Sequence, residues 1–426
     1  MTRSSSLSLR GSLVALLLLT VAPARAQQPM QEFVEAARAG ALDAQAAQAA
    51  LDVARSQTDE ARARLLPTLV ASAAYTRNEI EVAVQLSPER RAVISPYDQL
   101  DARFTLSVPI LDISSWSTFF AAEAAADAAE ERTEATDDDV EAAVVQLWHQ
   151  VVATRAVLTA AERSLEVAEQ ARANAAARVE VGVSPQLDLA RAEAESARAR
   201  QIVAEARLAD RLASRNLAIL TGLVPTAGAA ALPEADLADP GELESWLAEL
   251  ERRPGVRAAE RSRRSAELAA DASWQTLLPV ISGTGIERIT NAAGFGPNSV
   301  WSLAITATWT LDFVRPATIG TRDAQLSSAR IAEARALQLA ATQIVEAWER
   351  VRSLIVRAEA AQAQLVATTR AAEDARVRYE AGAGTQIEVI QAERDLFSAE
   401  VARIQAHADL RVAREVLRIR SGRDGS

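Results

Sequence analysis

Two carboxylates stand at equivalent places in this sequence and are its strongest candidates for chemistry. Asp188 and Glu388 lie 200 residues apart, and each follows a glycine, Gly182 or Gly382, by six positions. Carboxylates gathered at one place attract cations and repel one another unless positive groups pair with them. Asp188 has such a group three residues further on, in Arg191. A second interpretation, a solvated Asp188–Arg191 pair on one helix face, therefore stays open.

The other residue types offer little for catalysis or metal binding. The chain has no cysteine, two histidines and two methionines, and neither histidine has a second ligand at metal-binding spacing. No nucleophile elbow, phosphate-binding loop or catalytic triad pattern occurs among its serines and acids. We therefore expect no enzymatic activity, no metal site and no cofactor.

Both carboxylates belong to a duplicated unit. Residues 178–193 read RVEVGVSPQLDLARAE, and residues 378–393 read RYEAGAGTQIEVIQAE. The same offset relates Leu111-Asp112 to Leu311-Asp312. A fixed period of this length indicates that one large structural unit occurs twice.

The chain divides into four parts on this basis. The N-terminal segment has arginines before an apolar run and small residues before Gln27, as in a secretory signal peptide. We assign the parts as follows: signal peptide 1–26, first repeat 27–222, linker 223–253 and second repeat 254–426.

The first repeat is predicted to contain a helix of unusual length. No Gly or Pro interrupts residues 116–180, so we predict one helix of roughly 98 Å at 1.5 Å per residue. Gly182 is placed to end it in the left-handed conformation, and Pro185 to open a return helix over 185–221 at its first position. A shorter helix over 41–65 precedes the strands. Placed end to end, the two short helices nearly equal the long one, so both are expected to lie beside it.

The long helix carries a heptad pattern, and the second repeat follows the plan of the first. Steps of three and four residues, interrupted at Thr154, are typical of a coiled-coil seam, and they connect Val140, Val144, Leu147, Val151, Leu158, Ala161, Leu165 and Ala168. The elements expected in the second repeat are a helix near 255–278, strands within 279–311, a long helix over 316–380 and a return helix over 385–420.

The strands of the second repeat alternate apolar and small polar residues. From Trp301 to Leu311, one face is apolar, and Trp301 and Trp309 stand eight residues apart, about 26 Å along a strand. An apolar band with aromatic ends is typical of an outer-membrane barrel strand whose other face lines a lumen. The alternative is a half-buried strand of a soluble sheet.

The strand region of the first repeat, about 67–111, is less regular. We expect strands at 68–84 and 101–111, separated by a polar, Pro-containing loop at Ser87–Asp98. Its apolar alternation is one residue out of phase with the second repeat, which we ascribe to a bulge or to Pro109. Four strands are too few to enclose a wide lumen, so several chains would have to share one barrel.

The charge and composition of the chain limit the kinds of partner that it is expected to bind. Loss of the signal peptide removes Arg3, Arg10 and Arg25 and no acid, which takes the net charge from −11 to −14. An acidic chain is a poor partner for nucleic acid. Without cysteine, no lipid anchor can be attached at the mature N-terminus. We expect export into the periplasm or beyond, and any membrane-spanning part to consist of strands.

With these repeats, strands and turns, the mature chain resembles the TolC-like family of outer-membrane efflux ducts, the outer membrane factors. The duplicated order carries the resemblance, through the Ala-rich helix before Leu65-Leu66-Pro67-Thr68-Leu69, the segment Pro109–Trp116, the paired turns and Leu220-Thr221-Gly222. The family fold is mainly α-helical with a membrane β-barrel. The resemblance implies a homotrimer whose twelve strands, four from each chain, form one barrel in outer-membrane lipid. The helices would form a hollow α-helical barrel across the periplasm.

The resemblance also implies a function and its sites. The chain would be the passive exit duct of a tripartite efflux or type I secretion system, docked on a periplasmic adaptor, or membrane fusion protein, and an inner-membrane transporter. The docking tip would consist of Val181, Gly182, Val183, Ser184, Ala381, Gly382, Ala383 and Gly384. The membrane girdle would include Trp301 and Trp309.

The same resemblance assigns a periplasmic gate to Asp188, Glu388, Arg191 and Gln391. The family often has a second acid one turn after the first, whereas Arg191 and Gln391 occupy those places here. A doubled ring of acids is therefore missing from the expected gate. The competing function is a soluble periplasmic coiled-coil scaffold or adaptor without a pore, and the apolar, Trp-bearing strand face favours the channel.

Overall fold

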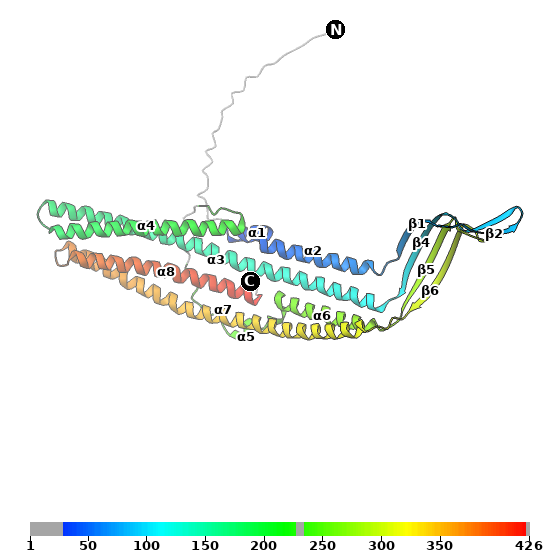
Figure 1. Ribbon diagram of the computed structural model, residues 1–426. Helices are drawn as coiled ribbons and strands as arrows, with labels where there is room; N and C mark the ends of the chain where they lie inside the picture. The colour runs from blue at the N-terminus through cyan, green and yellow to red at the C-terminus, as the bar shows by residue number, and fades with distance from the viewer. Residues whose placement is uncertain (1–28, 227–233, 423–426) are drawn as a thin grey trace, which may run out of the picture.

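The computed structural model describes residues 29–226 and 234–422. The expected signal peptide, 1–26, lies outside the described residues. The molecule is elongated, with helices running side by side along its length and the strands gathered at one end (Figure 1). No described helix is long and apolar enough to span a membrane.

The first repeat contains four helices and four strands. They are α1 (Met30–Gly40), α2 (Leu42–Ala63), β1 (Thr68–Arg77), β2 (Val82–Ser87), β3 (Arg90–Ser95), β4 (Asp98–Leu111), α3 (Ile113–Glu180) and α4 (Gln186–Thr221). α3 has 68 residues, consistent with the long uninterrupted run of helix-forming residues.

The second repeat has the same long-helix plan with one hairpin. Its elements are α6 (Pro254–Gln275), β5 (Val280–Thr290), β6 (Ser299–Thr308), α7 (Val314–Glu380) and α8 (Gln386–Ser421). Between the repeats lie the short helix α5 (Leu243–Leu247) and a 3-10 turn at Leu250–Arg252.

The repeated Leu-Asp dipeptide starts both long helices. Asp112 accepts a hydrogen bond from the Ser115 N–H (3.0 Å), and Asp312 accepts from the N–H groups of Val314 and Arg315 (both 3.0 Å). These carboxylates satisfy N–H groups that have no partner inside the helix. The duplicated aspartates are thus capping residues.

The predicted seam of α3 packs against the shorter helices. Val140, Val144 and Val151 are buried in one cluster with Leu217 of α4 and Phe33 of α1. α4 and α2 follow one another along α3, and α8 and α6 follow one another along α7 (Figure 1). The two short helices of each repeat therefore cover the length of the long one, as the lengths predicted.

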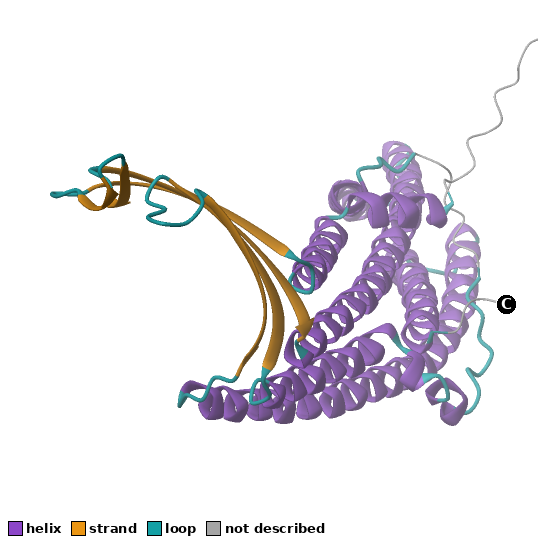
Figure 2. Ribbon diagram, turned by 90° about the vertical axis from the view of Figure 1, so that its right-hand side faces the viewer, coloured by secondary structure: helices purple, strands orange, loops and turns teal. Residues whose placement is uncertain are grey.

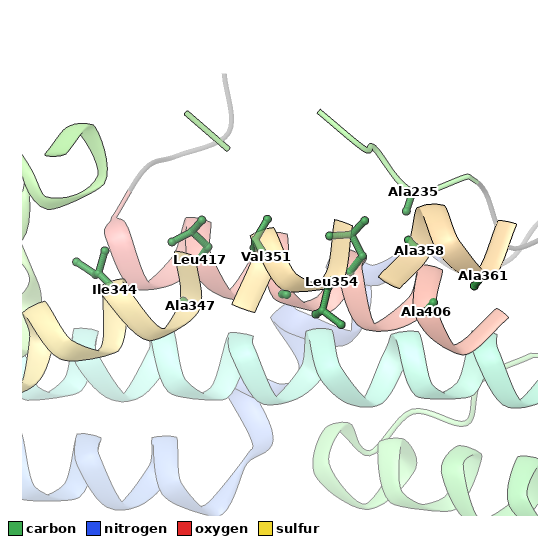
Figure 3. Packing of buried hydrophobic residues seen from close by; sticks show 11 residues of the cluster. Ala235, Ile344, Ala347, Val351, Leu354, Ala358, Ala361, Ala406 and Leu417 are labelled. Carbon is green, nitrogen blue, oxygen red and sulfur yellow. The ribbon is translucent and has the colours of Figure 1, made fainter. Parts of the chain in front are cut away.

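The second repeat has a matching core between α7 and α8. Ile344, Val351 and Leu354 of α7 meet Leu410 and Leu417 of α8, with alanines between them (Figure 3). Small side chains let the helix backbones approach closely, so the core is a narrow layer along the helices. A second contact surface joins α3 to α8, where Ala153 and Ala160 of α3 lie in one cluster with Ile404 and Ala408.

One helix was not predicted, and one local prediction about the helices is wrong. Residues 30–40 form the unpredicted helix, α1, and its Phe33 is buried. Pro185 does not open α4 as its first helical residue. It is the N-cap, with ψ of 152°, because the residue that redirects the chain into the helix still has extended geometry.

The four long strands form one antiparallel sheet in the order β1-β4-β5-β6. β4 and β5 belong to different repeats, so their pairing joins the two halves of the chain. The strands curve together at one end of the molecule (Figure 2). A register shift between Pro109 and Leu111 confirms the irregularity that the phase of the apolar residues predicted. Among the residues that the structure describes, β1 and β6 each have one edge without a strand partner.

The predicted loop Ser87–Asp98 is wrong. That segment forms most of a second antiparallel hairpin, in which β2 and β3 are joined through Pro88 and Glu89. Proline and polar residues suggested a loop of twelve positions, but the turn itself needs only two of them. Arg90–Ser95 pairs with β2 as strand β3, whereas Pro96 and Tyr97 lie in the connection to β4.

Candidate functional site

The helix turns of both repeats lie at the same end of the molecule, opposite the sheet (Figure 1). At the end of α3, the N–H of Gly182 donates to Val179 O (3.0 Å) and that of Val183 donates to Arg178 O (2.9 Å). Gly182 has a φ of +75° and Gly382 one of +74°, a region that glycine adopts without a Cβ clash. This is the Schellman end of a helix, and it occurs once in each repeat.

The turns present small and apolar groups to solvent. Val181 and Val183 are 72% and 73% exposed. An added Cβ would meet no atom within 4 Å at either turn glycine. Of the eight predicted docking residues, Ser184 and Gly384 are partly buried and the other six are exposed. The surface is thus open to close approach by another backbone.

Asp188 forms the ion pair that the sequence offered as its second interpretation. Its carboxylate lies 3.7 Å from Nη1 of Arg191, one turn further along α4. The Asp188 side chain is 19% exposed and that of Arg191 is 41% exposed. Pairs of this kind contribute about 0.3–0.5 kcal/mol. In this chain, Asp188 is therefore a partly neutralised charge.

Glu388 has a different local role, as part of a capping box at the start of α8. Its carboxylate accepts from the Thr385 N–H (3.2 Å), and the Thr385 hydroxyl accepts from the Glu388 N–H (3.4 Å). A Cβ at Gly384 would approach Glu388 Oε2 to 3.2 Å. The first repeat has Pro185 in place of Thr385 and lacks this cap. Gln391, one turn further on, is exposed.

A contact that was not predicted from the sequence links the helix turns of the two repeats. The guanidinium of Arg178, in the last turn of α3, lies 4.8 Å from the ring centroid of Tyr379, in the last turn of α7. The Tyr379 hydroxyl donates to Gln386 Oε1 (3.4 Å) at the start of α8. A cation–π contact of this kind is worth about 0.5–1 kcal/mol at an exposed site. It ties the first repeat to the second at the tip.

A second link joins the return helices. Arg394 of α8 donates from Nε to Glu195 of α4 (2.8 Å), and this hydrogen bond raises the pKa of Arg394. Arg376 of α7 pairs with Glu393 of α8. Glu195 and Arg394 are 199 positions apart and belong to different repeats. Residue spacing within one helix therefore could not predict this ion pair.

A cavity of about 550 Å³ separates the two helix pairs beside these links. It is lined from all four helices, including Asn174 of α3, Ile202 of α4, Tyr379 of α7 and Phe397 of α8. The charged residues Glu195, Arg376, Glu393 and Arg394 are among its lining residues, so the polar links between the helices border this cavity.

At the other end, the tryptophans flank the apolar face of β6. Trp301, Leu303 and Ile305 are 72%, 77% and 79% exposed. Trp309 lies one residue beyond the strand, and its indole N–H donates to Leu277 O (2.8 Å) where the helices meet the sheet. An apolar face this exposed needs a non-aqueous environment or a partner.

Among residues 29–226 and 234–422, no group of three or more His, Asp or Glu side chains is arranged to hold a metal ion. The two histidines are buried and separate from the tip. His149 lies beside Trp148, with ring centroids 4.9 Å apart, and His407 accepts from the Ala235 N–H (3.2 Å) in the inter-repeat segment.

The family model for outer membrane efflux proteins matches residues 33–223 and 248–423. The chain belongs to the outer membrane efflux protein family. The two matched ranges fall one in each repeat. A comparison with curated proteins finds no match.

Solved structures of TolC-like channels share the fold of this outer membrane efflux protein. The Campylobacter jejuni CmeC outer membrane channel has 18% identity, a TM-score of 0.78, and coverage of 93% of this chain and 86% of that chain. The open state of the Neisseria gonorrhoeae MtrE outer membrane channel has 22% identity, a TM-score of 0.77, and coverage of 93% and 89%. A membrane protein from Pseudomonas aeruginosa has 23% identity, a TM-score of 0.78, and coverage of 92% and 93%. The whole architecture, from tip to sheet, is therefore that of the family.

The gate assignment of Asp188 and Glu388 yields a test in electrical recordings. If both face a narrow path in a trimer, the double variant Asp188→Asn with Glu388→Gln should show weaker block by a trivalent cation than the wild type. Six carboxylates on one path focus the field, whereas a solvated pair is screened within about 10 Å at 0.1 M salt. Gln can still accept the capping hydrogen bond of α8, so the fold should persist. Equal block in the two proteins would mean that these acids face away from the path.

Proposed function

We propose that this protein is the outer-membrane channel of a tripartite export system. Three copies would close one twelve-stranded barrel in the outer membrane, with the long helices extending into the periplasm as a hollow cylinder. The protein would be a passive duct, docked at its tip on a periplasmic adaptor and an inner-membrane transporter. Membership of the outer membrane efflux protein family supports this location and class of function.

The observation that carries the proposal is the open, two-faced sheet. In the described part of the chain, β1 and β6 have unpaired edges, and the apolar face of β6 is exposed along its length. Unpaired edges and exposed apolar faces are unfavourable in water. Pairing β1 of one copy with β6 of the next, and turning the apolar face to lipid, would remove both costs.

The competing function, a soluble periplasmic scaffold without a pore, does not explain why the chain has this sheet. A scaffold needs the long helices, but it has no need of tryptophans at both ends of an apolar strand face. Exposed leucine, isoleucine and tryptophan on a soluble protein would instead favour aggregation. We therefore prefer the channel function to the scaffold function.

Docking at the tip is supported by the two exposed glycine turns. Their equal geometry gives each copy two similar contact points, so a trimer would offer six in a ring. An adaptor with repeated binding elements fits such an arrangement. The links made by Arg178 and Arg394 would hold neighbouring helix pairs together until the adaptor engages.

Reconstitution and fractionation test the proposed function. The purified protein should form pores in planar lipid bilayers, and the expressed protein should sediment with outer membranes. Recovery in the soluble periplasmic fraction, together with bilayers that stay electrically silent, would contradict the channel and favour the scaffold.

A further inference from the structure

The inner and outer faces of the sheet can be assigned residue by residue from its register. Residues paired across strands share a face, and successive residues alternate. Trp301 pairs with Glu287 and Leu303 pairs with Gly285, so these residues lie on the apolar, lipid-type face. Arg288, next to Glu287, lies on the opposite face, and its partner Arg103 on β4 lies there too.

That opposite face carries few charges, and they do not cancel. Its positions on β1 and β6 hold only Ser, Thr, Ala and Val. On β4 and β5 the charged residues are Asp101, Arg103 and Arg288. The sum is +1 per chain, whereas the full sequence has a net charge of −11. A positive inner face therefore stands out in an acidic protein.

One of the two arginines is neutralised and the other is not. Arg288 donates to Asp101 from Nε (2.9 Å) and from Nη2 (2.6 Å). Gln99 donates to the second oxygen of the same carboxylate (2.6 Å). Arg103 is exposed and forms no hydrogen bond or ion pair with any described residue. It stands directly across from Arg288, where a like charge is unfavourable.

We propose that Arg103 is an anion-attracting residue of the pore, which favours passage of anionic solutes through the barrel. The inference rests on the proposed function, because it requires three chains to close the barrel with the tryptophan face outward. Each chain then contributes one unpaired guanidinium at the same height on the inner wall. Three such groups form a positive ring.

The ring acts through its field. A barrel of twelve strands is too wide for three side chains to block. A guanidinium stays charged at every physiological pH, and its field extends about 10 Å at 0.1 M salt and about 30 Å at 0.01 M. The expected preference for anions is therefore strongest in dilute salt. Carboxylates, sulfates and phosphates on a solute would all be attracted, since guanidinium binds each of them.

Reversal potentials test this role. Wild type and variants are compared in planar bilayers under a potassium chloride gradient at low salt, and the chloride-to-potassium permeability ratio is measured. Arg103→Gln should lower this ratio by at least about twofold and Arg103→Glu should lower it further, because the local field weakens and then reverses. Arg103→Lys should keep the wild-type ratio. Asp101→Asn should raise it, because Arg288 then loses its counter-charge.

The single-channel conductance in concentrated salt controls for folding, and it should be the same in all five proteins. Equal permeability ratios in wild type, Arg103→Gln and Arg103→Glu, at unchanged conductance, would overturn the assignment of Arg103. A wild-type protein that forms no pores would contradict the proposed function itself, and with it the role of Arg103. The two failures are thus distinguishable.

Discussion

Replacing Gly182 and Gly382 together with phenylalanine should abolish export while the proposed trimer still assembles in the outer membrane. Both glycines have positive φ, so a side chain costs about 1–2 kcal/mol of local strain at each position. No neighbouring atom lies within 4 Å of the added Cβ, so the chain can still fold. The bulky rings would occupy the surface on which we propose that an adaptor docks. The measurement is export by cells that supply the matching adaptor and transporter.

Gly222 provides a matched control for this experiment. It also has positive φ, +72°, and an added Cβ there meets no atom within 4 Å. It ends α4 at the opposite end from the tip. Gly222→Phe therefore carries the same strain away from the tip and should retain export. Full export by the double tip variant, or equal loss in the control, would remove the tip from the mechanism.

Acidification from pH 7 to pH 4 should destabilise the protein by about 3 kcal/mol per protomer through His149. Burial lowers the pKa of this imidazole to about 4, with nearby Arg411 acting in the same direction and Glu415 opposing it. His149 Nδ1 is buried without a hydrogen-bond partner. The side chain is 5% exposed, so water cannot solvate an added charge.

The pKa values of His149 in the unfolded and folded states determine whether the stability rises or falls with pH. In the unfolded chain a histidine binds its proton near pH 6.5, whereas the folded protein binds it only near pH 4. Between these values the unfolded state holds more protons, so stability falls as pH falls and levels off below pH 4. Well above pH 6.5 neither state binds this proton, so the stability no longer depends on this group.

Thermal denaturation of the detergent-extracted protein at a series of pH values measures this effect. In His149→Gln, which is uncharged at every pH, the loss below pH 6.5 should be much smaller. Burial also lowers the pKa of His407, with Arg403 next in effect, so the double variant should lose still less. Acid loss of the same size in His149→Gln and in wild type would contradict the assignment to this histidine.

Much of the architecture follows from periodicity and from Gly and Pro placement. The 200-residue repeat, the uninterrupted runs and the glycines after them predict two long helices that end in equivalent turns. These signals are local, because helix length and helix termination depend on neighbouring residues. The turn glycines, the seam of α3 and the irregularity at Pro109 were therefore all accessible from the sequence.

The missed features depend on contacts between distant residues or on small energetic differences. Whether residues 82–95 form a loop or a hairpin is decided by a two-residue turn and cross-strand pairs. The links of Arg178 to Tyr379 and of Arg394 to Glu195 join different repeats. The capping box of Glu388 requires Thr385 as the N-cap residue of α8. The first repeat has Pro185 at the equivalent position and cannot form this cap.

If one chain forms a third of a closed duct, as we propose, the mass of the detergent-extracted particle reveals it most directly. Light scattering corrected for bound detergent measures the protein mass alone. One full-length chain has a mass of 45.5 kDa. We expect a particle containing three mature chains, because four amphipathic strands per chain need partners to close a barrel. A stable particle containing a single chain would contradict it.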